Sequence, residues 1–332
     1  MGQHLTGGRR AIGLDIGGTK IAGAVVQEDG SVLAELVEPT PEQSDARTTS
    51  TILLRLAEQL RTEHPEVVAI GVGAAGIVEW PTGLIRWAPN NDYRDWPVRA
   101  ELEEATGLPT AVDNDANVAA LAEARLGQQH YRDMMLLTVG TGIGGGLVIG
   151  GEIYRGPTGL GAELGHIIVN PDGPRCGCGN RGCLEAYASG TALTRMGREL
   201  AVAEPEGLVA RLARGDGAEV TGQTVTRAAE QGDPAAKALF GRLGRWLGVG
   251  IASLANIFEL EAVRIGGGLV ETGDLLLEPA RAVAREYTYA PKTRGIAPVL
   301  PSTFGSDAGM IGAAVLGLEH AAQARIGQMP HS

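Results

Sequence analysis

The chain has 332 residues, long enough for two domains, and its 44% hydrophobic and 20% charged residues are ordinary for a globular enzyme. The net charge of −11, the absence of a Lys/Arg-rich block and the aromatic content of 4% argue against a nucleic-acid partner. The apolar runs are too short or too interrupted to span a bilayer, and the Gly-rich residues 1–10 read as a flexible N-terminus without a signal peptide. We therefore expect a cytoplasmic protein with no membrane partner.

The first part of the chain alternates short apolar runs with turns and amphipathic segments. A loop with several Trp and Pro residues interrupts this pattern at 80–96. The hydrophobic spacing and turn signals predict strands at 11–14, 21–26, 32–37, 67–72 and 110–112, and helices at 47–62, 98–106 and 116–126.

The second part begins with a unit that repeats the pattern of the first part. Thr138–Gly146 places a Gly-rich turn between apolar strands, as Asp15–Thr19 does near the N-terminus. A long loop at 151–185 and mainly helical segments follow, with a helix from Asp233-Pro234 to about 258, a strand at 262–265 and a last helix at 308–318.

Two such units indicate a duplicated α/β fold. The expected small lobe is 11–115, completed by a C-terminal helix at about 306–325. The expected large lobe is 116–305 and contains a metal loop at 163–185.

Three Gly-rich turns are candidates for binding a nucleotide. Consecutive backbone N–H groups can cradle phosphate oxygens, and the carboxylate in the first turn can hold Mg²⁺. The second turn has five glycines in seven residues, more than a hairpin needs, although each turn could also serve the fold alone. The candidates are Asp15, Gly17, Gly18, Thr19 and Lys20; Gly140, Thr141, Gly142 and Gly144; and Gly266, Gly267 and Gly268.

A polar run, Asp113-Asn114-Asp115-Ala116-Asn117, follows the predicted strand at 110–112. Active sites of open α/β sheets gather at the carboxyl ends of strands. A carboxylate there, Asp115, can accept the proton of an attacking hydroxyl. Asp and Asn also cap helices, but a cap needs only one of these residues. The run therefore favours a catalytic site.

The clustered cysteines predict a metal site. Three thiolates and one imidazole, from Cys176, Cys178, Cys183 and His166, complete a tetrahedral zinc shell with no open position, as in structural sites. Three buried thiols without metal are the alternative. Glu163 and Glu185 are tethered to the same loop, where they can accept hydrogen bonds from vicinal sugar hydroxyls or remain ordinary surface glutamates.

These motifs resemble the ROK family of bacterial sugar kinases and repressors, and most closely its Gram-positive glucokinases. The resemblance rests on DIGGTK (15–20), VDNDAN (112–117), TVGTGIGGG (138–146), GAELGH (161–166), CGCGNRGCLE (176–185) and ASGTAL (188–193), with Ala-Pro-Asn at 88–90 and Leu-Pro at 108–109.

The resemblance implies an actin/hexokinase-like fold, with two ribonuclease-H-like lobes and a central cleft. It implies ATP, Mg²⁺ and structural Zn²⁺ as cofactors, and a homodimer or homotetramer. Asp115 would deprotonate the 6-hydroxyl of glucose. The hexose would be bound by Gly76, Asn90, Asn114, Asp115, Glu163, His166 and Glu185.

Other readings remain open at this stage. The substrate could be fructose, mannose, N-acetylglucosamine or N-acetylmannosamine, because one hydroxyl contact can decide among sugars. Polyphosphate could replace ATP as the donor. A ROK-type repressor is disfavoured because about ten residues precede the first strand, and an actin-like or chaperone ATPase has no need of the cysteine loop.

Overall fold

The computed structural model describes residues 8–41, 45–88, 92–215, 217 and 219–327. Most of the expected flexible N-terminus, residues 1–7, lies outside the described residues. The chain forms two compact units. Unit 1 comprises Met1–Arg132, Gly146–Ala162 and Thr303–Ser332, and unit 2 comprises Asp133–Gly145 and Glu163–Ser302.

Unit 1 is built on a five-stranded sheet with the order β3-β2-β1-β4-β8. Strands β1, β2 and β3 are antiparallel neighbours, whereas β4 and β8 continue the sheet in parallel with β1. The bounds are β1 Arg10–Ile16, β2 Lys20–Gln27, β3 Val32–Pro39, β4 Ile70–Ala74 and β8 Thr110–Asn114. Parallel pairing requires crossovers, and helices supply them here.

Helices cover both faces of this sheet. They are α1 Ala46–Glu63, α2 Val98–Thr106, α3 Asp115–Leu126 and α11 Ala308–Gly327, the last preceded by the 3₁₀ turn η3 Gly305–Asp307. Large apolar side chains such as Leu14 and Ile70 pack with Leu56 of α1 in one core. The opposite face carries small residues such as Ala22, which pack with Ala314 of α11 in a second core.

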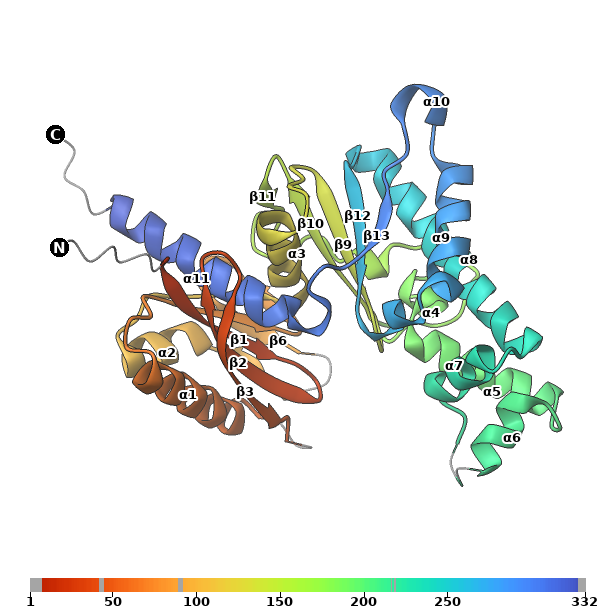
Figure 1. Ribbon diagram of the computed structural model, residues 1–332, viewed down its shortest axis with the longest axis horizontal. Helices are drawn as coiled ribbons and strands as arrows, with labels where there is room; N and C mark the ends of the chain where they lie inside the picture. Colours follow the sequence, from red (N-terminus) through yellow and green to blue (C-terminus); the bar gives the residue numbers. More distant parts are fainter. Residues whose placement is uncertain (1–7, 42–44, 89–91, 216, 218, 328–332) are drawn as a thin grey trace, which may run out of the picture. The chain divides into compact units, whose positions relative to one another are not determined.

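Helix α11 approaches the sheet very closely because two strand positions have no side chain. Figure 1 shows this blue helix beside the red strands, so the two ends of the sequence meet in one unit. A Cβ on Gly13 would overlap the carbonyl oxygen of Met310, and one on Gly71 would overlap that of Ala313. Some of the 50 glycines of the chain therefore serve close packing between helix and sheet.

Residues expected to form the Trp- and Pro-bearing loop at 80–96 include strands of a small sheet with the order β5-β6-β7. Its strands are β5 Ile77–Glu79, β6 Leu84–Trp87 and β7 Arg94–Trp96. Tyr93 and Trp96 are buried here, with ring centroids 5.0 Å apart. The strands are too short to show an alternating pattern in the sequence.

The second five-stranded sheet has the order β11-β10-β9-β12-β13, with bounds β9 Met134–Val139, β10 Ile143–Ile149, β11 Glu152–Ile153, β12 Ala262–Gly266 and β13 Val299–Pro301. The division between the units falls inside β10, after Gly145. Strand β12 is parallel to β9 and β13, and β10 is antiparallel to β11. This order repeats that of the first sheet and confirms the expected duplicated α/β fold.

Unit 2 is rich in helices, as expected. They are α4 Glu185–Ala188, α5 Gly190–Ala203, α6 Leu208–Gly215, α7 Gly222–Glu230, α8 Pro234–Phe258, α9 Asp274–Tyr287 and α10 Pro291–Arg294, with 3₁₀ turns η1 Leu164–His166 and η2 Gly268–Thr272. The predicted start of α8 is confirmed, since the Asp233 side chain accepts a hydrogen bond from the Ala236 N–H and Pro234 stands in the first turn.

The compact units do not follow the expected lobe boundary at 115. Helix α3 lies in unit 1, because it packs against α11 so closely that a Cβ on Gly312 would overlap the Val118 carbonyl oxygen. The C-terminal helix belongs to unit 1, and its end at Gly327 lies close to the expected residue 325 and beyond 318. No helix among the described residues is long and apolar enough to cross a membrane.

The close approach of α11 gives a stability prediction. Gly71→Ala should destabilise the protein by about 1–3 kcal/mol, because the neighbouring atoms are backbone and cannot move aside without shifting the helix. Urea denaturation followed by circular dichroism measures this. Gly241→Ala in α8 is the control, since no atom lies within 4 Å of its Cβ position and alanine favours a helix. Equal stability of the two variants would contradict the packing argument.

Candidate active site

Three parallel strands of unit 1 end at the same edge of the first sheet. Asp15 on β1 is in register with Gly73 on β4, and Gly73 is in register with Asp113 on β8. A Cβ on Gly73 would lie 3.7 Å from both Asp15 Oδ1 and Asp115 Cα. The register therefore brings together the predicted magnesium ligand, Asp15, and the predicted base, Asp115.

Burial raises the pKa of both carboxyl groups. Burial and then the negative charge of Asp115 raise the pKa of Asp15 to about 7, and Lys20 opposes the change. Burial also raises the pKa of Asp115, against hydrogen bonds from the Ala116 N–H and from Asn114. A base with a raised pKa holds an abstracted proton more firmly, which suits general base catalysis near neutral pH.

Asn114 orients the start of helix α3. Its side-chain oxygen accepts hydrogen bonds from the N–H groups of Ala116 (2.9 Å) and Asn117 (3.3 Å), so it is the N-cap. Its amide nitrogen donates to the Gly76 carbonyl at 3.1 Å. Gly76 has φ +113°, which favours glycine, and a Cβ there would overlap the Trp87 carbonyl oxygen. The predicted sugar residue Asn90 lies outside the described residues.

A buried ion pair supports this run and was not anticipated. Asp113 is 1% exposed, and its Oδ2 accepts a hydrogen bond from Arg155 Nε at 2.6 Å. Its Oδ1 accepts from the Asn114 N–H and the Asn117 side-chain amide. The Arg155 guanidinium also lies 3.9 Å from the ring centroid of Trp80. No local pattern marks Arg155, because the pair joins residues 42 positions apart.

The first Gly turn is a hydrogen-bonded hairpin whose outer face has space around Gly18. The Gly17 N–H donates to the Lys20 carbonyl at 3.0 Å, and the Thr40 hydroxyl donates to the Gly17 carbonyl at 2.8 Å. No atom lies within 4 Å of a Cβ placed on Gly18, and Thr19 is exposed. The face that could meet a phosphate is therefore clear of side chains in unit 1.

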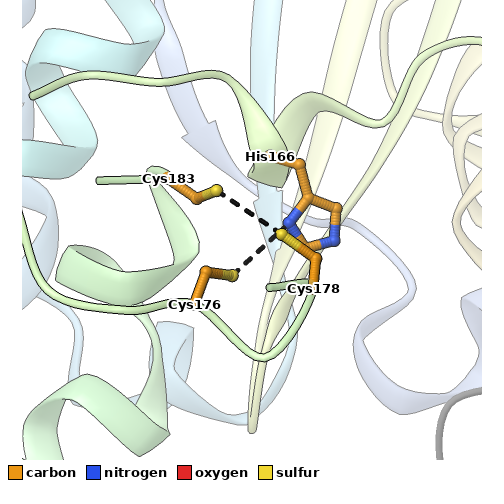
Figure 2. Close-up of side chains that lie close together, drawn as sticks. All are labelled: His166, Cys176, Cys178 and Cys183. Carbon is orange, nitrogen blue, oxygen red and sulfur yellow. Dashed lines mark hydrogen bonds between the residues drawn. The ribbon is translucent and has the colours of Figure 1, made fainter. Parts of the chain in front are cut away.

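In unit 2 the predicted metal ligands form a cluster. Figure 2 shows the heads of His166, Cys176, Cys178 and Cys183 turned toward a common point. All four ligand atoms lie within 4.8 Å of one another, with 3.6 Å between Cys176 Sγ and His166 Nδ1 and 3.7 Å between Cys178 Sγ and Cys183 Sγ. A tetrahedron with Zn–S bonds of about 2.3 Å has edges of about 3.8 Å, so the cluster fits zinc.

The two predicted sugar carboxylates flank this cluster. Glu163 is exposed and directly precedes η1, which ends at His166. Glu185 is the first residue of α4 and is half-buried. Its Oε1 accepts from the Cys176 thiol at 3.3 Å, and its Oε2 accepts from the Ile143 N–H at 2.9 Å. Glu185 therefore contacts both the metal loop and the second Gly turn.

The glycines of the second turn serve mostly the packing of unit 2 and strand β10. A Cβ would overlap Glu185 Oε2 at Gly142 and the Ala116 carbonyl oxygen at Gly146, and it would lie 2.6 Å from Leu164 at Gly145. Gly144 lies within β10, and Gly140 has open space around its Cβ position. At these three positions the surrounding protein also requires glycine, and contact of the turn with a nucleotide stays a prediction.

The third Gly run also has a structural cause. Gly266 ends β12 and Gly268 begins η2. Gly267, between them, has φ +81°, and a Cβ there would lie about 2.6 Å from the backbone of Val139. The run therefore turns the chain against the end of β9, and its contact with a nucleoside stays a prediction.

Comparisons with known proteins agree with these motifs. The model of the ROK family matches residues 11–320. The glucokinase of Streptomyces coelicolor is 42% identical over 93% of this chain and 97% of its own length.

Two solved structures extend this likeness to the fold. A ROK family glucokinase from Streptomyces griseus in complex with glucose and AMPPNP has a TM-score of 0.82 at 42% identity, covering 93% of this chain and 99% of that one. The ROK hexokinase from Thermus thermophilus has a TM-score of 0.77 at 36% identity, covering 95% and 99%. The actin/hexokinase-like class expected from the sequence is thereby confirmed. This chain belongs to the ROK family.

Proposed function

We propose that this protein is an ATP-dependent glucokinase, which transfers the γ-phosphoryl group of ATP to the 6-hydroxyl of glucose. The observation that carries the proposal is the half-buried Asp115 carboxylate beside Asp15 at the end of three parallel strands. Glucokinase relatives matched over nearly the whole chain support it, as does the likeness to a structure holding glucose and an ATP analogue.

Asp115 acts as the general base. As the sugar oxygen attacks the γ-phosphorus, its proton passes to the Asp115 carboxylate, and the bond from the γ-phosphorus to the ADP oxygen breaks. Burial raises the pKa of Asp115 and so makes it a better acceptor. The Asn114 cap and the Asp113–Arg155 pair hold the start of α3, so the carboxylate cannot turn away freely.

Asp15 and the Gly turns are proposed to bind the nucleotide. Asp15 suits Mg²⁺, because it offers hard carboxylate oxygens and because a cation would relieve its repulsion with Asp115. When bound, the ion neutralises charge on the phosphates. In unit 1 the backbone of Gly18 and the backbone and hydroxyl group of Thr19 would bind phosphate oxygens. In unit 2 the turn at 140–144 is proposed to bind phosphate through its backbone.

The metal cluster is proposed as a structural zinc site. Its four protein ligands leave no position for a water, so it supplies no chemistry to the reaction. It fixes His166 and the loop that leads to Glu185, which with Glu163 would accept hydrogen bonds from the sugar hydroxyls. Three unpaired thiols also suit a reducing compartment, the cytoplasm. The homodimer or homotetramer implied by the family remains a prediction.

The first test is a coupled ADP-release assay across a hexose panel, with ATP and polyphosphate as donors. We expect glucose with ATP to give the highest kcat/KM. Asp115→Asn should lower kcat by about 10²–10⁴-fold at an unchanged melting temperature, because the amide cannot accept the proton. Near-normal turnover by this variant would refute the base, and a preference for another sugar would refute glucose.

Zinc removal gives the second test. Metal analysis of the purified protein should find one zinc per chain, and Cys178→Ser should lose it, lower the melting temperature and raise the KM for glucose. Asp172→Asn, on an exposed residue of the same loop, should keep the zinc. A zinc-free Cys178→Ser protein with unchanged melting and KM would show that the cluster does not support the sugar site.

The third test concerns the charge of Asp15. Its carboxyl titrates near pH 7 in the folded protein and near 3.8 in the unfolded chain, so its ionisation costs stability as pH rises from about 4 to about 7. Asp15→Asn removes this cost. We expect its melting temperature to exceed that of the wild type by about 2–6 °C at pH 8 and by much less at pH 5, without Mg²⁺ or nucleotide. A gap that is independent of pH would contradict the raised pKa.

A further inference from the structure

The segment from the metal loop to α5 lies along the second Gly turn. Besides the Glu185 contact with Ile143, the Gly190 N–H donates to the Gly140 carbonyl at 2.7 Å. The N–H and the hydroxyl of Thr191 both donate to the Thr141 carbonyl, at 3.2 and 2.8 Å. The turn is therefore held at three successive points by residues 185–191, all within unit 2.

Glu185 is the charged member of this set. Its Oε2 accepts from the Ile143 N–H at 2.9 Å and fills the space that a side chain on Gly142 would need. A hydrogen bond to a carboxylate is stronger than one between neutral groups. The position of the turn and the position of this carboxylate are therefore tied together.

We propose that Glu185 couples sugar binding to nucleotide binding, as the direct link between the sugar site and the phosphate-binding turn at 140–144. This inference rests on the proposed function, which gives Glu185 to the sugar and the turn to ATP. Sugar hydroxyls that bind Glu185 restrict its side chain, and through Ile143 N–H they also restrict the turn.

The expected sign of the coupling is positive. A nucleotide that binds an already ordered turn loses less conformational entropy than one that must order it. Linkage is reciprocal, so ATP strengthens glucose binding by the same factor as glucose strengthens ATP binding. Gly190 and Thr191 fix one end of the turn, at Gly140 and Thr141. Restricting the Glu185 carboxylate fixes the other end, at Ile143, so the turn is then ordered at both ends.

The test measures the dissociation constant of AMPPNP by titration calorimetry with and without saturating glucose. The wild type should bind AMPPNP about 5–150-fold more tightly with glucose. Glu185→Ala should reduce this factor to near one. Glu185→Gln, which keeps an acceptor for the Ile143 N–H, should retain most of it. Glu163→Ala, the matched deletion of the other sugar carboxylate, should weaken glucose binding yet keep the factor.

Gly142→Ala tests the same contact from the nucleotide side. Its methyl group would displace the Glu185 carboxylate, so glucose affinity should fall several-fold in the absence of nucleotide. Circular dichroism and melting temperature confirm folding. If Glu185→Ala binds no glucose at any accessible concentration, Gly142→Ala still tests whether the contact between Glu185 and the turn links the two sites.

The outcomes separate the two proposals. A wild-type protein that binds no glucose refutes the proposed function. A wild type that phosphorylates glucose but shows no coupling refutes the inference. Two further results refute it as well: coupling in Glu185→Ala as large as in Glu163→Ala, and unchanged glucose affinity in Gly142→Ala.

Discussion

The parallel register of β1, β4 and β8 is the constraint on which the site in unit 1 depends. It sets Asp15, Gly73 and Asp113 in one row at the edge of the sheet, and Asp115 follows two residues later as the first residue of α3. Three carboxylates in so small a space repel one another unless each has its own compensation. Asp113 pairs with Arg155, whereas only the charge of Lys20 opposes the raised pKa of Asp15, and only hydrogen bonds oppose that of Asp115. Unit 1 therefore neutralises Asp113, whose role is structural, with an arginine. Asp15 and Asp115, which are proposed for function, have no such partner and keep raised pKa values.

Small residues make this arrangement possible. Gly309, in the first turn of α11, lies so close to Asp15 that a Cβ on it would be 2.6 Å from Asp15 Oδ2. Gly13 and Gly71 let the same helix pack closely on the sheet. Protein interiors are packed to the density of organic crystals, so a single methyl group in such a contact must displace backbone. The C-terminal helix thus completes the first unit and also closes one side of the Asp15 carboxylate.

The sequence predicted most strands of the two five-stranded sheets, the helices of unit 1, helix α8, the duplicated fold and the metal cluster, because hydrophobic spacing, turn residues and cysteine spacing are local signals. It did not reveal the small sheet that includes residues from the Trp- and Pro-bearing loop, since strands of three or four residues show no period. The glycine surplus of the second turn suggested a ligand, and neighbouring atoms of the protein also account for the absence of a side chain at Gly142, Gly145 and Gly146. The partners of Asp113 and Glu185 were also out of reach, because nothing in a single sequence pairs residues so far apart.

The contacts made by Asp113 and Glu185 show what a metal ion would contribute to the loop before Glu185. Arg155–Asp113 and Glu185–Ile143 each join residues 42 positions apart, and closing a loop costs entropy that rises slowly with its length. The first loop contains α3, β9 and β10, whose regular hydrogen bonds already order it. The second contains the stretch 167–184, which has no helix or strand and is held by isolated bridges such as Ile168–Cys183 and by hydrogen bonds of turns. A zinc ion bound by His166 and the three cysteines would fix that stretch two residues before Glu185, so the carboxylate meets the Gly turn at little further entropic cost.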